Sequence, residues 1–280
     1  MTIRSIPKAE ISARPGVRSD VTPKALSHWN PEVRSASDDA DATISILDVI
    51  GMDYWGDGVT AKRITAALRA IGERPVVVNV NSPGGDFFEG LAIYNALREH
   101  KAKVTVNVLG VAASAASVIA MAGDEIRIAR AGFLMIHNTW VLAAGDRHAL
   151  TEVAEWLAPF DAVSAEIYAA RSGIEVKKIE AMLDKETWIS GTAAVDQGFA
   201  DSLLASDEID STADPQERGA EARAEKKFDV LAHKAGVTRS EARELLAALK
   251  GGKPGAASDG KPGAAVIAEV ADLLAFAKSL

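Results

Sequence analysis

The chain has 280 residues, of which 48% are hydrophobic, and a formal net charge of −8 at pH 7. Such a chain can fill the core of one large domain and carry an appendage, and its negative charge without a dense Lys/Arg block argues against a nucleic-acid partner. Because the chain has no cysteine, disulfides, thiolate nucleophiles and cysteine-ligated metals are excluded, and a nucleophile would be an oxygen or a lysine.

The first 42 residues predict a flexible leader. They carry four prolines and scattered Ser, Asp and Arg residues, with no sustained hydrophobic period. Residues 1–9 lack an apolar core of signal-peptide length, and no segment reaches the roughly 18 unbroken apolar residues of a membrane helix. We therefore expect a cytoplasmic protein with no membrane partner.

Short apolar runs alternate with helical patterns between residues 43 and 205. Strands are predicted at 44–50, 75–80, 104–108, 125–128 and 133–136, and helices at 59–71 and 88–97. Several of the apolar runs show too little alternation for a half-exposed strand, which indicates a sheet covered on both faces. The order of strands and helices predicts one α/β domain over residues 43–205, built from crossover units.

A long helix is predicted over residues 147–171, with Pro159 expected to kink it. Mostly apolar residues recur along this segment at spacings of three and four positions, which would place them in one seam on the helix surface. Its members are Leu150, Val153, Leu157, Phe160, Ser164 and Ile167. Such a helix either packs on its own domain or projects to meet a neighbouring subunit.

Residues 206–280 predict an appended tail outside the main core. The composition shifts here to Asp, Glu, Ala, Lys and Arg, and residues 251–263 form a flexible low-complexity linker. Short helices are predicted on either side of this linker, at about 238–249 and 265–278.

A run of small residues, GVAASAAS at 110–117, places one serine between two apolar segments. Small residues two positions before and two positions after Ser114 suit a sharp strand-to-helix turn that leaves the serine hydroxyl exposed above a sheet. A helix packed closely on a strand would use the same residues, so the motif depends on its context.

A glycine pair, Gly84 and Gly85, follows the strand predicted at 75–80 in the segment NSPGG at 81–85. Paired glycines at a strand-to-helix turn expose backbone N–H groups, which can hold an anion or a developing oxyanion. A plain tight turn is the alternative. The segment is not a phosphate loop, because the required spacing of glycine and lysine is absent.

Two further kinds of side chain could complete a catalytic site. Of the five histidines, only His137 emerges directly from a predicted core strand, where a scaffold could fix its imidazole against a serine. A carboxylate at Glu186 or Asp184 could orient that imidazole, although both also suit a solvated cluster that caps a helix. Lys185 lies beside them and leaves a serine-lysine dyad open.

In chain order, these motifs resemble the ClpP family of serine peptidases, peptidase S14, over roughly residues 43–205. The segments that carry the resemblance are 81–85, 110–115, 135–137, a carboxylate, and GFAD at 198–201. Residues 89–95 and the alanine-rich turn most resemble the phage branch of the family, the ClpP-related head maturation (prohead) proteases.

The resemblance also implies roles for individual residues. Ser114 matches the nucleophile, His137 the general base, and the backbone N–H groups of Gly84 and Ala115 the oxyanion donors. Glu186 aligns where the family usually has aspartate, and Asp184 is the alternative acid. No metal or cofactor is implied, and the histidines and carboxylates show no metal-ligand spacing.

The implied fold is a ClpP/crotonase-like superhelical βαβ core with a projecting handle helix, flanked by the leader and the partly helical tail. The handle would lie along the seam from Leu150 to Ile167 and join subunits into a homo-oligomeric ring. The implied substrates are proteins or peptides, with capsid or scaffold proteins as partners inside a phage prohead.

Other functions stay open at this point. One is a housekeeping-type proteolytic subunit that works with a Clp ATPase. Two others belong to different classes: a catalytically silent capsid-assembly scaffold protein, and a crotonase-type acyl-CoA enzyme that shares the fold but needs no serine nucleophile.

Overall fold

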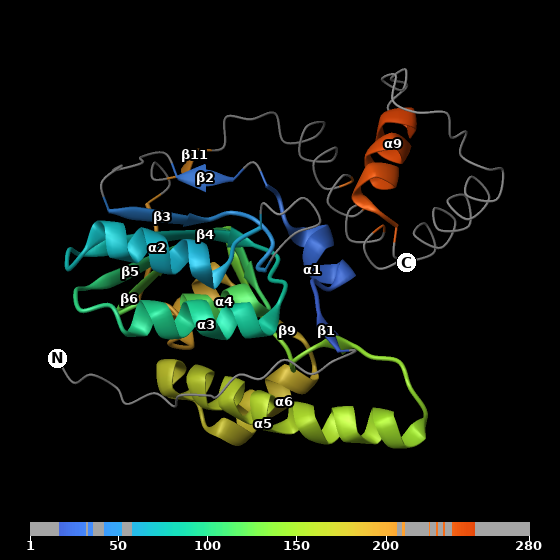
Figure 1. Cartoon of the computed structure of the whole chain (residues 1–280). Coiled ribbons are helices and arrows are strands. Elements are labelled where there is room, and N and C mark those ends of the chain that lie inside the picture. Colours follow the sequence, from blue (N-terminus) through green and yellow to red (C-terminus); the bar gives the residue numbers. More distant parts are fainter. Residues whose placement is uncertain are drawn as a thin grey trace. The chain divides into compact units, whose positions relative to one another are not determined.

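The computed structural model describes residues 17–31, 33–35, 42–51, 58–205, 209–210 and 237–249, together with residues 224, 228 and 232 (Figure 1). They belong to two compact units, Met1–Ala224 and Glu225–Leu280. All the predicted site residues lie in the first unit.

The second unit contains helix α9 (Arg239–Leu249), where the sequence predicts a helix over 238–249. Thr238 precedes it and takes part in a capping box, since its backbone N–H donates to Glu241 Oε2 at 2.8 Å. The linker predicted at 251–263 and the helix predicted at 265–278 lie outside the described residues.

A mostly parallel sheet of seven strands forms the centre of the first unit. Its long strand β5 pairs with β6 along its first half and with β7 along its second half, and β9 closes this end by pairing antiparallel with β7. The strands are β3 (Thr43–Ile46), β4 (Val76–Ser82), β5 (Val104–Ala113), β6 (Glu125–Ile128), β7 (Phe133–Ile136), β9 (Thr187–Ser190) and β10 (Ser202–Leu203).

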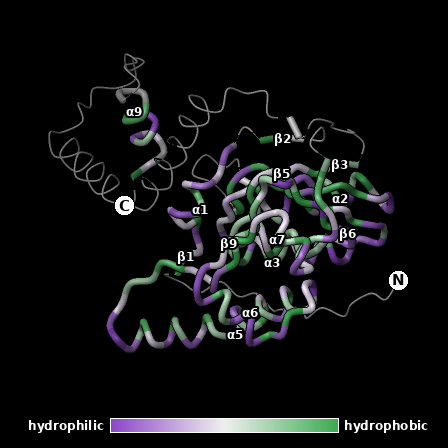
Figure 2. The backbone as a smooth tube through the Cα atoms, turned by 180° about the vertical axis from the view of Figure 1, so that it is seen from behind, coloured by the Kyte–Doolittle hydropathy of each residue, from purple (hydrophilic) through white to green (hydrophobic). Residues whose placement is uncertain are grey.

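The inner strands are buried on both faces, which explains their nearly continuous apolar sequence. In β4, for example, Val76, Val78 and Val80 are at most 1% exposed, and the Asn79 side chain on the other face is also buried. The hydrophobic colours in Figure 2 gather in this sheet. The predicted strands are all present, with β4 and β5 extending beyond the predicted ends and β3 stopping before its predicted end.

Helices pack around the sheet, and α2 and α3 lie side by side (Figure 1). None of the helices that the structure describes is long and apolar enough to cross a membrane. Within residues 58–205, the helices are α2 (Ala61–Ile71), α3 (Phe87–Arg98), α4 (Ala115–Ala120), α5 (Arg147–Ser172), α6 (Val176–Asp184) and α7 (Gly191–Asp196).

The longest helix, α5, changes character along its 26 residues. Its first half is mostly exposed, with Leu150 at 46%, whereas Phe160 and Ile167 in the second half are buried in the core. The helix continues past Pro159, and its first half extends away from the sheet (Figure 1).

Part of the predicted leader is folded onto this unit. Strand β1 (Arg18–Ser19) pairs antiparallel with β8 (Val141–Leu142), and helix α1 (Pro23–His28) follows it. The N-cap of α1 is Thr22, whose hydroxyl accepts a hydrogen bond from the Ala25 N–H at 3.2 Å. A second short pair joins β2 (Arg34–Ser35) to β11 (Ile209–Asp210).

Trp29 anchors this folded part of the leader. Its side chain is 1% exposed, and its indole N–H donates to the Asn81 carbonyl at 2.9 Å. The prediction of a flexible leader over residues 1–42 therefore does not hold for residues 17–31. Its anchors Val21, Leu26 and Trp29 are too irregularly spaced to give a period, and Pro23 begins a helix rather than preventing one.

Candidate active site

Ser114 occupies the turn between β5, which ends at Ala113, and α4, which begins at Ala115. Its backbone has φ 55° and ψ −127°, an uncommon conformation for a residue other than glycine. The flanking alanines at positions 112, 113, 115 and 116 are at most 1% exposed, so larger side chains would not fit beside the turn. The structure thus has a strained strand-to-helix turn where the small-residue motif predicts one.

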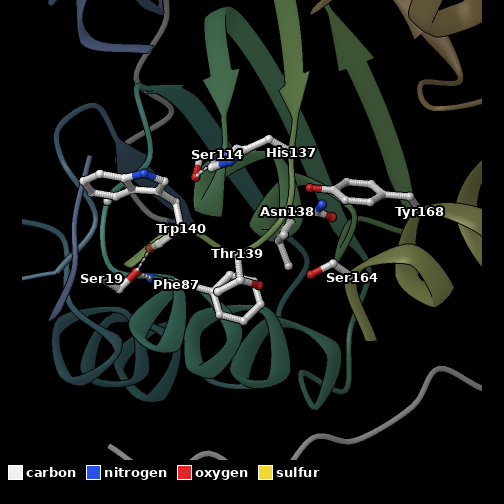
Figure 3. A pocket seen from close by; sticks show the side chains of 11 residues that line it. Ser19, Phe87, Ser114, His137, Asn138, Thr139, Trp140, Ser164 and Tyr168 are labelled. Atoms are coloured by element: carbon white, nitrogen blue, oxygen red, sulfur yellow. Dashed lines mark hydrogen bonds between the residues drawn. The ribbon is translucent and has the colours of Figure 1, made fainter. Parts of the chain in front are cut away.

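His137 meets Ser114 at the end of the sheet, and its Nε2 lies 2.7 Å from Ser114 Oγ (Figure 3). The reason is the register of two parallel strands, in which Ala113 of β5 lies opposite Met135 of β7. The residues that follow this pair leave the sheet at the same edge. Ser114 also donates its backbone N–H to the Met135 carbonyl at 2.8 Å, which ties the two strand ends together.

The environment of His137 favours a neutral ring. Burial lowers the pKa of His137, and the negative charge of Glu186 opposes this effect without cancelling it. A neutral imidazole can accept the proton of a serine hydroxyl, which a charged one cannot. The geometry and the electrostatics therefore both suit a general base beside Ser114.

The two predicted acids lie near His137, but neither carboxylate is hydrogen-bonded to its ring in the part of the chain that the structure describes. Glu186 Oε1 binds Lys24 Nζ at 2.8 Å and accepts from the Trp188 indole N–H at 3.2 Å. Asp184 accepts from the Asn138 side chain at 2.8 Å.

Glu186 is nevertheless charged and electrostatically coupled to the site. Burial acts to raise the pKa of Glu186, but the hydrogen bonds from Lys24 and Trp188, together with the charges of Lys24 and His137, outweigh it and lower that pKa. Lys185, the candidate for a serine-lysine dyad, is exposed at the end of α6. Ser114 has His137 as its side-chain partner instead.

The glycine pair lies directly against the serine turn. Gly84 has φ 87°, and a Cβ added to it would lie 2.5 Å from the Ala113 carbonyl oxygen and 2.7 Å from Ser114 Cβ. Its N–H donates to Ser82 Oγ at 3.2 Å. Gly85, which the sequence analysis did not single out as a donor, lines the cavity beside Ser114. The N–H of Ala115 is the first of α4 and has no acceptor within that helix.

A narrow cavity of about 10 Å³ adjoins Ser114 and His137 (Figure 3). Its walls include Trp140 from the segment after His137, Tyr168 from α5 and Ser19 from β1. Sequence reasoning missed Ser19, because no local signal links a leader residue to the site. No three His, Asp or Glu side chains come together as metal ligands anywhere in the described ranges.

Asp161 is another residue that the sequence analysis did not identify. It lies on α5 and accepts the Thr139 N–H at 2.6 Å, which fixes the segment that follows His137. Burial raises the pKa of Asp161, and the hydrogen bonds from Thr139 oppose this. The helix α5 thus supports the site as well as extending from it.

Comparison with known proteins places the chain in a family. The model of the Clp protease family matches residues 55–207, more than half of the chain. The ATP-dependent Clp protease proteolytic subunit of Ligilactobacillus salivarius (strain UCC118) is 32% identical over 134 residues, 47% of this chain and 68% of that protein.

Two further relatives give a similar result. The ATP-dependent Clp protease proteolytic subunit 3 of Rhodococcus jostii (strain RHA1) is 31% identical over 48% of this chain and 67% of its own length. The ATP-dependent Clp protease proteolytic subunit of Oltmannsiellopsis viridis is 30% identical over 48% of this chain and 69% of its own length. This chain therefore belongs to the Clp protease family, a family of serine peptidases.

Proposed function

We propose that this chain is a serine endopeptidase whose nucleophile is Ser114 and whose general base is His137. Ser114 Oγ attacks a peptide carbonyl carbon while His137 Nε2 accepts the hydroxyl proton, and the amine leaves with a proton from the imidazolium. Water then hydrolyses the acyl-enzyme. The observation that carries the proposal is the 2.7 Å contact between Ser114 Oγ and His137 Nε2 at a strained turn.

Backbone N–H groups would stabilise the tetrahedral oxyanion. The resemblance to the family assigns this role to Gly84 and Ala115, and Gly85, which lines the cavity, is a further candidate. Each such donor typically lowers the barrier of acyl transfer by about 3 kcal/mol.

The experiment that tests this proposal is covalent labelling with a fluorophosphonate, which reacts only with an activated serine. We expect a single labelled peptide that contains Ser114, identified by mass spectrometry, and no label after denaturation of the protein. Labelling of a different serine would overturn the assignment.

The biological role that we propose is head maturation: cleavage of capsid or scaffold proteins within a phage prohead, by a ring whose subunits meet through α5. Its support is the resemblance of residues 89–95 and of the alanine-rich turn to that branch of the family. The names of the three relatives support a second role equally, as a proteolytic subunit that receives protein substrates from a Clp ATPase.

Substrate requirements separate these two roles. A head maturation protease should cleave a capsid or scaffold protein encoded beside it without ATP, whereas a Clp-type subunit should degrade a folded protein only when a Clp ATPase and ATP are added. Native mass spectrometry would report whether the chain forms a ring in either case.

The pH dependence of peptide hydrolysis should follow His137. Because burial lowers the pKa of His137, the neutral base persists at a lower pH than for a free imidazole. We expect kcat/KM to fall as the pH drops, with a midpoint below the usual histidine value near 6.5. Circular dichroism over the same range would exclude acid unfolding. A midpoint above 6.5 would contradict the proposed environment of the base.

Glu186→Gln should lower kcat/KM roughly 10²-fold, less than the ~10⁴-fold effect of replacing a triad acid bonded to its histidine. The reason is that Glu186 acts on His137 through its charge rather than through a bond in this structure. Since that charge raises the pKa of His137, its removal should also move the midpoint of the pH profile downward. Asp184→Asn is the matched control and should change kcat/KM less than about twofold. A larger loss of kcat/KM for Asp184→Asn than for Glu186→Gln would make Asp184 the acid.

A further inference from the structure

Strand β1 of the leader contributes a residue to the wall of the candidate active site. Ser19 lines the same cavity as Ser114 and His137, and its hydroxyl accepts the Phe87 N–H at 2.8 Å (Figure 3). The same hydroxyl donates to the Trp140 carbonyl at 3.4 Å. Phe87 follows the glycine pair and Trp140 follows His137, so Ser19 joins the two backbone segments that border the site.

The backbone of β1 is held in the way that an extended peptide is held. Arg18 lies opposite Leu142 and Ser19 opposite Val141, so β1 forms an antiparallel pair with β8. Within the described residues this pair is a sheet of only two strands. The edge of β8 that β1 covers begins four residues after His137, where a peptide placed beside Ser114 could add a strand.

The segment after β1 is fixed more firmly than β1 itself. Val21 and Trp29 are buried at 1% exposure, whereas an isolated two-stranded pair is marginally stable in water. Between these anchors, α1 presents Lys24 to Glu186 at 2.8 Å. The leader therefore both forms part of the cavity wall and holds the carboxylate that would otherwise be available to His137.

We propose that residues 17–20 occupy the peptide-binding edge of the active site and keep the chain latent until they are displaced. An extended substrate segment and residues 17–20 then compete for the same edge of β8. This inference rests on the proposed peptidase function for its consequence, but the competition itself is a binding property that can be measured without catalysis.

A reversible crosslink tests the proposal on the full chain. Because the protein has no cysteine, the pair Ser19→Cys and Val141→Cys offers one possible disulfide within the chain, and residues directly opposite in an antiparallel pair are close enough for it. Non-reducing electrophoresis would separate this product from disulfide-linked dimers. We expect peptidase activity in the oxidised form to be at least about tenfold below that in the reduced form, since a closed site lowers the competent fraction. Each single-cysteine variant should give equal rates in both states.

A loosening variant should have the opposite effect. Ser19→Pro removes the hydroxyl that bonds the Phe87 N–H and the Trp140 carbonyl, and proline has no backbone N–H to donate to β8, so we expect kcat/KM for a short peptide to rise by about tenfold. Ser27→Ala, on the exposed face of α1, is the matched control in the same leader and should leave kcat/KM unchanged. Equal rates for Ser19→Pro and the native chain would overturn the proposal while leaving the peptidase assignment intact.

The last experiment measures peptide binding and does not depend on catalytic activity. In a Ser114→Ala background, a fluorescent peptide with the sequence of residues 17–22 should bind the reduced Ser19→Cys, Val141→Cys protein and fail to bind the oxidised one, as measured by anisotropy. Equal binding in both states would disprove the competition. If the Ser19→Pro protein, in which this edge is open, lacked all fluorophosphonate labelling while the binding difference remained, the proposed catalytic role would fail and the inferred peptide site would stand.

Discussion

Ser114→Ala should lower kcat/KM for peptide hydrolysis by roughly 10⁴-fold or more, to the residual level that binding and the oxyanion donors alone support. The hydroxyl is the only group of this residue that can form the acyl-enzyme, and its removal leaves His137 without a proton to accept. The backbone turn should persist, because the Ser114 N–H and carbonyl keep their partners, the Met135 carbonyl and the Ser117 hydroxyl.

The measurement is steady-state hydrolysis of a fluorogenic peptide together with thermal unfolding. Ser27→Ala is the control for loss of a serine hydroxyl and should be fully active. His137→Ala should lose activity to a similar degree, and the double variant should be no worse than either single one, because the two groups act as a unit. A Ser114→Ala protein that retains more than about a tenth of the native rate would place the nucleophile elsewhere.

Residues that are close in sequence or in strand register made much of the site predictable. The small residues around Ser114 indicate the turn, and the buried runs of β5 and β7 bring Ser114 and His137 to one edge of the sheet. These features depend on local sterics and on strand pairing, both of which leave a pattern in the sequence. The glycine pair follows the same logic, since β4 neighbours β5.

The position of the leader could not be predicted from such patterns. The hydrogen bond between Ser19 and Trp140 joins residues 121 positions apart, and a two-residue strand is too short to show alternation. The ion pair between Glu186 and Lys24 could not be predicted either, because Lys24 lies in a segment whose prolines suggested a linker. Long-range contacts made by short elements leave no periodic signal.

Gly84→Ala should also lower peptidase activity strongly, because the added methyl group would push the glycine pair against the serine turn. A Cβ at this position would meet the Ala113 carbonyl oxygen at 2.5 Å and Ser114 Cβ at 2.7 Å, and neither atom belongs to a flexible side chain that could swing away. Either the loop or the turn must shift. Because a displacement of about 1 Å at a reacting group can cost 10²-fold in rate, we expect kcat/KM to fall by about 10² to 10³-fold.

Gly173→Ala separates this steric effect from the conformational preference of glycine. Gly173 ends α5 with φ 77°, close to the 87° of Gly84, but a Cβ there would meet no atom within 4 Å. Both variants should lose about 1 kcal/mol of unfolding free energy from the positive φ, whereas only Gly84→Ala should lose activity and additional stability. Equal kcat/KM values for the two variants would mean that the glycine pair serves only as a turn. A selective loss would show that the close approach of Gly84 to Ser114 is part of the catalytic arrangement.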